Sequence, residues 1–259
     1  MPTTDFDSTP RPTALITGAA TGIGFAIADG LARRGVQVLL NDFDAAAADA
    51  AAGRIRQSGG VCEACPGDAA DVAFIQQFVD TAVDRFGSVD LAIANAGITV
   101  FGDVFSTTPA AFEQIVNLNL RGSYFLAQRA ASQMRLQGRG GRILFMSSVV
   151  GHIGHPGLPV YSMTKAGLEM LAKQLVIDLS PLGITVNAIA PGATLTERTL
   201  DDPDYIPVWS RITPMGRPAN VTDIAEAALF LLSPAAGHIT GQSLVIDGGW
   251  TSVGIPPVG

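Results

Sequence analysis

The stretch that decides the fold is Thr17-Gly18-Ala19-Ala20-Thr21-Gly22-Ile23-Gly24. It separates a short apolar segment, Ala14–Thr17, from Gly22–Arg34, where apolar residues recur at helical spacing. A strand, a glycine-rich turn and a helix in this order predict a dinucleotide-binding unit. Glycines let the backbone approach a pyrophosphate, and the helix N-terminus offers free N–H groups. The glycine triplet alone is a weak signal, for which an ordinary tight turn is the alternative, and its context strengthens it.

Strand-like and helix-like segments alternate along the rest of the chain. The predicted strands are Ala14–Thr17, Val36–Asn41, Val61–Pro66, Leu91–Ala94, Arg142–Ser147, Thr185–Ala190 and Ser243–Asp247. The predicted helices are Gly22–Arg34, Asp44–Gln57, Val72–Phe86, Pro109–Gln137 with a break near Asn119, Tyr161–Leu179 and Thr222–Leu232. Apolar strands separated by helices predict an α/β fold. We expect a single doubly wound Rossmann-type domain, with a seven-stranded parallel sheet covered by helices on both faces.

Two segments stand apart from this alternation. Met1–Arg11 is polar and contains proline, so we interpret it as a flexible leader before one dinucleotide-binding and catalytic domain over residues 12–259. Gly192–Pro218 is rich in proline and aspartate and is predicted to be a long irregular loop. We interpret this loop as a lid over the substrate, and an ordinary surface insertion is the alternative.

The composition excludes several classes of protein. The 259-residue chain has a formal net charge of −7, and an acidic surface repels phosphate backbones, so nucleic acid is not an expected partner. No apolar run reaches the roughly 18 residues that a membrane span needs, and no signal peptide is evident, so we expect a cytoplasmic protein without a membrane partner. Cys62 and Cys65 point to opposite faces of a predicted strand and lack a second ligand pair, which predicts inert thiols and no metal site.

Asp42 ends the second predicted strand, downstream of the glycine turn. A carboxylate at this point accepts hydrogen bonds from the adenosine ribose hydroxyls and repels a 2′-phosphate. Neither Thr21 nor Phe43 is basic, so the sequence favours NAD over NADP. The alternative is a capping role at the next helix, for which Asp44 is the better candidate.

Tyr161 and Lys165 lie four positions apart on one face of a predicted helix. A lysine cation at this spacing stabilises the phenolate of a tyrosine, which makes the phenol a usable base. The pair alone is a weak signal. Polar residues follow two predicted strands at the edge where ligands bind in open α/β sheets, namely Ser147 and Ser148 after one and Asn95 after another.

These motifs together resemble the short-chain dehydrogenase/reductase family over the segment from Pro12 to Trp250. The matching residues are Thr17-Gly18-x-x-x-Gly22-Ile23-Gly24, Asn95-Ala96-Gly97, Asn119, Ser148, Tyr161-x-x-x-Lys165 and Pro191-Gly192. The interval to Tyr161 selects Ser148 over Ser147, and Asn119-Leu120-Arg121-Gly122 selects Asn119 over Asn117.

The resemblance implies a role for each matched residue. Tyr161 is the general acid/base, Ser148 holds the substrate oxygen, Lys165 supports the phenolate and bonds the nicotinamide ribose, and Asn119 kinks its helix and holds a water. Asp68 corresponds to the adenine contact, although Ala69 stands where valine or leucine is usual. The implied cofactor-binding residues are Gly18, Thr21, Gly22, Ile23, Gly24, Asp42, Phe43, Asp68, Ala69, Asn95, Ala96, Gly97, Tyr161, Lys165, Pro191, Gly192, Thr194 and Thr196.

By the same resemblance we expect an oxidoreductase that transfers a hydride between NAD and a secondary alcohol, either a sugar, a polyol or a cyclic alcohol. A 3-oxoacyl-carrier-protein reductase or another ketone reductase is the first alternative, and a non-catalytic redox sensor is the second. The family usually forms homotetramers through two long helices. His152 and His155 lie between Ser148 and Tyr161, either as substrate contacts or as solvated loop residues.

Overall fold

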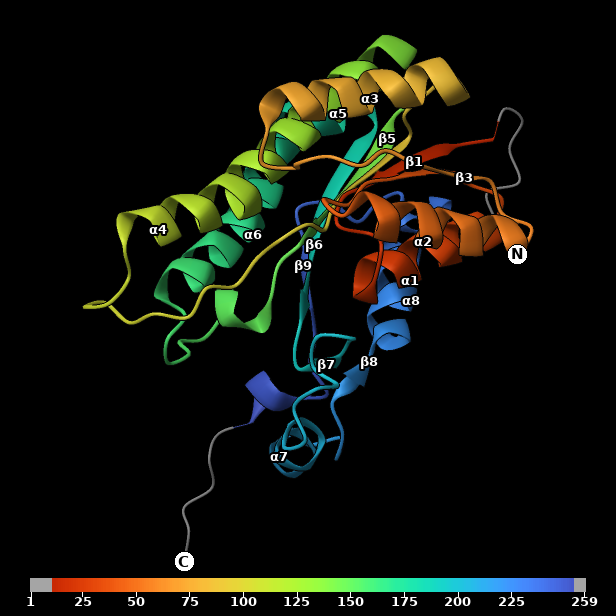
Figure 1. Cartoon of the computed structure of the whole chain (residues 1–259). Coiled ribbons are helices and arrows are strands. Elements are labelled where there is room, and N and C mark those ends of the chain that lie inside the picture. Colours follow the sequence, from red (N-terminus) through yellow and green to blue (C-terminus); the bar gives the residue numbers. More distant parts are fainter. Residues whose placement is uncertain (1–10, 254–259) are drawn as a thin grey trace, which may run out of the picture.

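A parallel sheet lies at the centre of the computed structural model, which describes residues 11–253 (Figure 1). Most of the predicted leader and the last six residues of the chain lie outside the described part. The sheet has seven strands in the order β3-β2-β1-β4-β5-β6-β9. Their bounds are β1 (Thr13–Ile16), β2 (Gln37–Leu40), β3 (Cys62–Ala64), β4 (Leu91–Ala94), β5 (Gly141–Met146), β6 (Ile184–Pro191) and β9 (Ser243–Ile246). The seven predicted strands are confirmed, with ends that shift by one or two residues.

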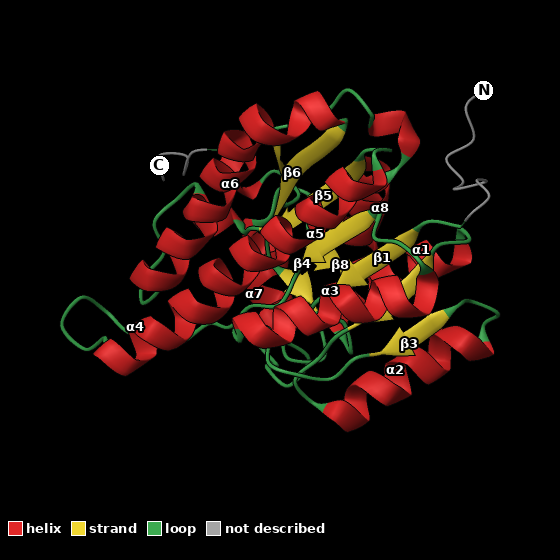
Figure 2. Ribbon diagram, turned by 90° about the horizontal axis from the view of Figure 1, so that it is seen from above, coloured by secondary structure: helices red, strands yellow, loops and turns green. Residues whose placement is uncertain are grey.

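Helices cover both faces of this sheet (Figure 2). They are α1 (Gly22–Arg33), α2 (Ala45–Gln57), α3 (Val72–Phe86), α4 (Pro109–Val116), α5 (Ser123–Gln137), α6 (Pro159–Leu179), α7 (Tyr205–Ile212) and α8 (Val221–Leu232). Side chains of α1, α2 and α8 fill one core, and those of α3, α5 and α6 fill the other. Because side chains alternate along a strand, Ile16 of β1 enters the first core while Leu15 enters the second.

The two cysteines follow the same alternation. Cys62 is buried in the core beneath α1 and α2, whereas Cys65 packs on the opposite core. This confirms that the two thiols face opposite sides of the sheet. Burial raises the pKa of the Cys62 thiol to about 12, so this sulfur stays protonated and behaves as a small apolar group.

The break predicted near Asn119 is a π-helical segment, η1 (Asn117–Gly122), between α4 and α5. A π segment adds a residue to the helical turn, and such segments often occur at functional sites. At its end Gly122 approaches the Ala69 carbonyl so closely that a Cβ on Gly122 would collide with that oxygen. The turn after β3 and the α4–α5 helix are therefore fitted to each other.

The prediction of an irregular loop over Gly192–Pro218 is wrong in part. This segment contains the helix α7, and its strand β7 (Thr194–Leu195) pairs in parallel with β8 (Ala219–Asn220). The prolines gave the misleading signal, because Pro207 lies in the first turn of α7, where a missing N–H costs nothing. Tyr205 also fixes the start of α7 by hydrogen bonds between its hydroxyl and the Thr194 backbone.

Parallel strands bring their carboxyl ends to one edge of the sheet. The glycine turn follows β1, Asn95 follows β4, Ser147 and Ser148 follow β5, and Gly192 follows β6. The topology therefore gathers the motifs at this edge. No helix within residues 11–253 is both long and apolar enough to cross a bilayer.

Candidate active site

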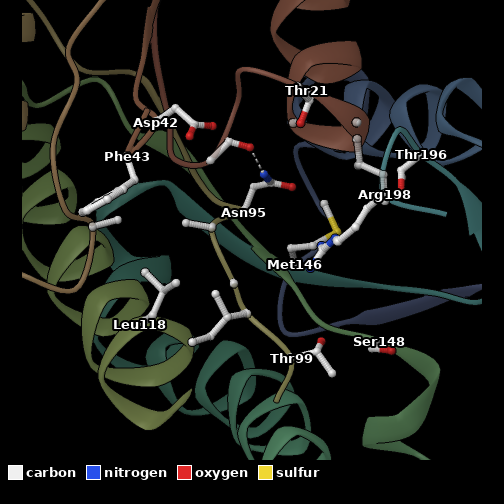
Figure 3. A pocket seen from close by; sticks show the side chains of 18 of the residues that line it. Thr21, Asp42, Phe43, Asn95, Thr99, Leu118, Met146, Ser148, Thr196 and Arg198 are labelled. Atoms are coloured by element: carbon white, nitrogen blue, oxygen red, sulfur yellow. Dashed lines mark hydrogen bonds between the residues drawn. The ribbon is translucent and has the colours of Figure 1, made fainter. Parts of the chain in front are cut away.

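A cleft of about 1290 Å³ opens at this edge of the sheet (Figure 3). Every predicted site residue except Asn119 lines it. The lining set comprises Gly18, Thr21, Gly22, Ile23, Gly24, Asp42, Phe43, Asp68, Ala69, Asn95, Ala96, Gly97, Ser148, Tyr161, Lys165, Pro191, Gly192, Thr194 and Thr196. Residues from most of the chain length thus share one surface.

The glycine turn is shaped by Asn95. Its Nδ2 donates to the carbonyl of Gly18 at 2.7 Å and to that of Thr17 at 3.0 Å. Gly18 has a φ of +62°, and a Cβ there would lie 2.8 Å from Ala96 Cα, while a Cβ on Gly24 would collide with Gly18 O and Asn95 Nδ2. Only glycine fits at these two positions, so the bare backbone remains open to a ligand. This cradle at the N-terminus of α1 fits a pyrophosphate.

The first N–H of α1 is already bonded to an anion of the protein. Gly22 N donates to Oε2 of Glu197 at 3.0 Å, and Glu197 follows β7 and also lines the cleft. Thr21, the residue before the helix, makes no side-chain cap. A carboxylate therefore lies where the helix dipole attracts negative charge, and it marks the position as suited to an anion.

Asp42 faces the same turn, where its Oδ2 accepts from Ala20 N at 3.1 Å. Its Oδ1 accepts one longer bond, of 3.3 Å, from Asp44 N. The capping alternative belongs to Asp44, whose side chain accepts from Ala47 N at the start of α2. Each carboxylate oxygen of Asp42 keeps acceptor capacity toward the cleft.

Tyr161 and Lys165 both project from α6 toward the end of β5. Lys165 is 3% exposed, and its Nζ donates to Met146 O at 2.6 Å and lies 5.3 Å from the centre of the Tyr161 ring. Ser148 Oγ accepts a long bond of 3.4 Å from Val150 N, which leaves the serine hydrogen for a ligand in the cleft. A phenol, a buried ammonium and a hydroxyl donor thus converge, and together they suit proton transfer at a substrate oxygen.

Asn119 lies behind the cleft and is fully buried. Its Oδ1 accepts from Ile98 N at 2.9 Å, and its Nδ2 donates to Ile98 O at 3.0 Å and to Thr164 Oγ1 at 3.2 Å. Gly97 lies in front of it in a tight fit, because a Cβ there would lie 3.3 Å from Asn119 Oδ1 and 3.4 Å from Lys165 Nζ. Asn119 therefore joins the segment after β4 to α6.

Comparisons with known proteins agree with this geometry. A family model described as enoyl-(acyl carrier protein) reductase matches residues 18–251. An L-rhamnose 1-dehydrogenase (NAD(P)(+)) of Azotobacter vinelandii is 38% identical over 244 residues, which cover 92% of this chain and 95% of that protein. A 3-oxoacyl-[acyl-carrier-protein] reductase of Synechocystis is 36% identical over 91% of this chain and 95% of its own length. The crystal structure of a short-chain type dehydrogenase/reductase from Mycobacterium marinum superposes with a TM-score of 0.91 at 32% identity, covering 96% of this chain and 98% of that one.

This chain belongs to the short-chain dehydrogenase/reductase family. It is an oxidoreductase of CH–OH groups that uses a nicotinamide cofactor. The glycine cradle and Asp42 fit this cofactor, since they offer backbone N–H groups to its phosphates and a carboxylate to its ribose.

Further lining residues of this short-chain dehydrogenase/reductase were not predicted. One group comes from the segment after β7, namely Glu197, Arg198, Thr199 and Tyr205. A second group comes from the stretch between β4 and α5. Its members are Ile98, Thr99, Gln114, Asn117 and Leu118. Glu197 could have been predicted, because it directly follows the predicted site residue Thr196 in the sequence. Asn117 lines the cleft, whereas Asn119, which the family motif favours over it, is buried behind the cleft.

Proposed function

We propose that this dehydrogenase oxidises a secondary alcohol of a sugar or polyol with NAD, using Tyr161 as the general acid/base. The observation that carries the proposal is the convergence of Tyr161, Lys165 and Ser148 in one cleft with the glycine cradle. When bound, the cofactor supplies the hydride acceptor. In the oxidation Tyr161 takes the hydroxyl proton, Ser148 donates a hydrogen bond to the same oxygen, and the buried Lys165 stabilises the phenolate.

Asn119 supports this chemistry from behind the cleft. Its side chain bonds to the Ile98 backbone and to Thr164 Oγ1, and both Asn119 Oδ1 and Lys165 Nζ lie close to Gly97, which lines the cleft. We assign to the Asn119 segment the water that relays protons from Lys165 to solvent, by the resemblance to the family. The π-helical geometry supports this role because it disturbs the regular backbone ladder.

The preference for NAD over NADP rests on Asp42. Its carboxylate repels a 2′-phosphate and accepts from ribose hydroxyls. Two basic side chains line the cleft, Lys165 and Arg198. Figure 3 shows Arg198 across the pocket from Asp42, so it does not offset the charge of Asp42.

A polyhydroxylated substrate fits the side chains of the inner cleft. Thr99, Gln114 and Asn117 are uncharged donors and acceptors that line it, and Figure 3 shows Thr99 on the side of the pocket where Ser148 lies. Two further relatives are named L-rhamnose 1-dehydrogenases, from Sphingomonas and from Scheffersomyces stipitis, at 38% and 35% identity. We therefore place sugars first among the substrates.

A 3-oxoacyl reductase is the second candidate, because relatives with that name are nearly as similar, at 36% and 37% identity. Docking of an acidic carrier needs a basic surface. The segment over the cleft instead carries four acids, Glu197, Asp201, Asp202 and Asp204, against three arginines, Arg198, Arg211 and Arg217. Of these arginines, Arg217 is already paired with Asp223. This charge balance favours a free small molecule.

Residues 192–218 are proposed to act as the lid. The helix α7 buries none of its residues fully, and it is attached through Tyr205 and through the edge-on contact of Trp209 with Trp250, whose ring centres are 5.0 Å apart. An element with few buried contacts opens at low free-energy cost, as substrate lids do.

A homotetramer, as is usual in the family, is supported by apolar residues on the outer face of α6. Met163, Met170 and Ile177 recur every seventh position and are 47%, 61% and 67% exposed. Such a stripe on a long helix suits packing against a second copy. The free thiols and the nicotinamide cofactor favour a cytoplasmic location.

The proposal is tested by steady-state turnover with two groups of substrates. Aldoses, polyols and cyclic alcohols are supplied with NAD, and a 3-oxoacyl thioester is supplied with NADH and NADPH. The proposal predicts that the highest kcat/KM belongs to a sugar or polyol. A higher kcat/KM for the thioester would establish the second candidate instead.

A further inference from the structure

A buried carboxylate that the proposed mechanism does not use lies one helical turn beyond Lys165. Glu169 of α6 is 8% exposed, and it does not line the cleft. Burying a carboxylate is costly unless it is hydrogen-bonded. Its Oε1 receives two donors, Ser147 Oγ at 2.7 Å and His152 Nε2 at 2.9 Å. A single oxygen thus joins two residues that lie on either side of Ser148.

The segment between those two residues is short and internally bonded. Gly151 N donates to Ser148 O at 2.8 Å and His152 N donates to Val149 O at 2.9 Å, which closes the 3₁₀ turn η2 (Val149–Gly151). Because Ser147 and His152, at the two ends of this segment, both bond to Glu169, the segment has little freedom to shift along α6. The hydroxyl of Ser148 is carried at its start.

The contact between η2 and α6 is close. A Cβ on Gly151 would lie 3.1 Å from both Ala166 N and Glu169 Oε1, so this approach favours glycine. Nearby, Lys165 Nζ donates to Met146 O, and Ser147 Oγ also lies 2.9 Å from Lys165 O. The end of β5 is therefore held to the helix that carries Tyr161 and Lys165 at successive points.

The hydrogen-bond chemistry of this cluster is determined by the carboxylate. Glu169 only accepts, so Nε2 of His152 carries a hydrogen, in the neutral ring or in the imidazolium. The side chain of His152 is 33% exposed, and neither histidine of the loop lines the cleft. His152 thus bonds to Glu169 and lies outside the lining of the cleft.

We propose that Glu169 and His152 are positioning residues, which fix the Ser148 hydroxyl relative to Tyr161 by holding residues 147–152 on α6. This inference rests on the proposed function, in which Ser148 and Tyr161 act on one substrate oxygen. Reacting groups displaced by about 1 Å lose on the order of a hundredfold in rate. Loss of the Glu169 hydrogen bonds to Ser147 and His152 is therefore expected to lower kcat. It should have little effect on cofactor binding at the glycine cradle.

The test compares Glu169→Ala, Glu169→Gln and the control Gln174→Ala, an exposed polar residue of the same helix. Glutamine keeps an oxygen at the position where both donors bind, so Glu169→Gln should retain most activity. Glu169→Ala should lower kcat by about tenfold to a hundredfold while the Kd for NADH stays within about twofold. His152→Ala should show the same kcat effect, with partial rescue by His152→Gln, and serves where Glu169→Ala does not fold.

Amide hydrogen exchange, measured with NADH bound, gives a second result that does not depend on turnover. Glu169→Ala should speed exchange in residues 147–153 relative to wild type and Glu169→Gln. A wild-type kcat for Glu169→Ala and His152→Ala, equal impairment of Glu169→Gln and Glu169→Ala, or unchanged exchange in this segment would each overturn the inference. Failure of the proposed function gives a different result, because the wild-type enzyme would then turn over no alcohol. Amide exchange in residues 147–153 would still show whether Glu169 holds this segment on α6.

Discussion

Two adjacent serines at the end of β5 have different surroundings. The hydroxyl of Ser147 is engaged by Glu169 and the Lys165 carbonyl, whereas Ser148 keeps its hydrogen available to the cleft. The one holds the strand end to α6, and the other is free to donate to a substrate oxygen. Tyr161, on the same helix as Lys165, is the group that would exchange a proton with the substrate oxygen.

Replacing Tyr161 by phenylalanine removes this proton acceptor and leaves the ring in place. We expect kcat to fall by about a hundredfold to ten-thousandfold, the usual contribution of a general acid/base. NADH affinity, measured by fluorescence titration, should hardly change. The matched control is Tyr124→Phe on α5, whose side chain is 41% exposed and does not line the cleft. Substantial activity in Tyr161→Phe would refute the assignment.

Asp42 and Asp44 form a second matched pair, one beside the cradle and one at a helix cap. Asp42→Ala should raise the Kd for NAD by about tenfold to a hundredfold, because charged hydrogen bonds to the ribose are lost. Asp44→Ala should leave that Kd unchanged and lower stability by about 1 kcal/mol, because it removes a cap. Calorimetric titration and thermal unfolding separate the two effects. Equal affinity loss in both variants would contradict the role given to Asp42.

Sequence reasoning found most of the residues in the cleft because each sits in a motif with local chemical meaning. Gly18 and Gly24 are required by backbone contacts, and Tyr161 and Lys165 by their shared helix face. It did not find the link between His152 and Glu169, whose partners are brought together only by the packing of η2 on α6. Such long-range pairs leave no periodic signal in a chain.

At the scale of elements, the contact between α1 and the segment after β7 bears on cofactor entry. Glu197 holds the Gly22 N–H to which a phosphate would bind. Removing its charge should favour the phosphate, because a carboxylate at a helix N-terminus gains about 0.3–1 kcal/mol. Glu197→Gln is therefore expected to tighten NADH binding by about twofold to fivefold.

The control for this variant is Glu226→Gln on α8, whose carboxylate pairs with Arg34 and does not line the cleft. Both proteins are titrated with NADH at low and high salt. The difference between them should shrink as salt screens the charge. Weaker NADH binding in Glu197→Gln would contradict this account.

Two helical glycines differ in what surrounds them. A Cβ on Gly53 of α2 would have only the tip of the Arg56 side chain within 4 Å, whereas a Cβ on Gly122 of η1 would collide with the Ala69 carbonyl oxygen. Gly53→Ala should stabilise the protein by about 0.5–1 kcal/mol, as alanine favours the helix. Gly122→Ala should destabilise it by about 1–3 kcal/mol through overpacking. Chemical denaturation measures both, and a stabilised Gly122→Ala would show that the π segment is not tightly fitted.

Elements with a strong period were predictable, and α3 and β4 have the predicted bounds. The helix α7 was not, because the segment Gly192–Pro218 around it is rich in prolines and aspartates, the residues that usually mark a loop. Its structure depends on tertiary partners, namely the Thr194 backbone for Tyr205 and Trp250 for Trp209. Local sequence carries no record of these partners.

At the scale of the whole molecule, the sheet separates two cores, and the outer face of α6 carries the exposed stripe Met163, Met170 and Ile177. A charge in the middle of this face should prevent self-association. Met170→Glu is expected to lower the mass in solution by light scattering, whereas Ala50→Glu, an exposed site on α2, should not. An unchanged mass in Met170→Glu would show that this face does not join subunits.

We propose that Tyr161, Ser148, Lys165 and Asp42 make the cleft an NAD-dependent alcohol dehydrogenase site. The most direct test measures kcat/KM for sugars, polyols and cyclic alcohols with NAD and with NADP, following formation of the reduced cofactor. We predict turnover of at least one sugar or polyol, with a clearly higher kcat/KM for NAD because of Asp42. Turnover of none of these alcohols, or equal efficiency with NADP, would contradict the account.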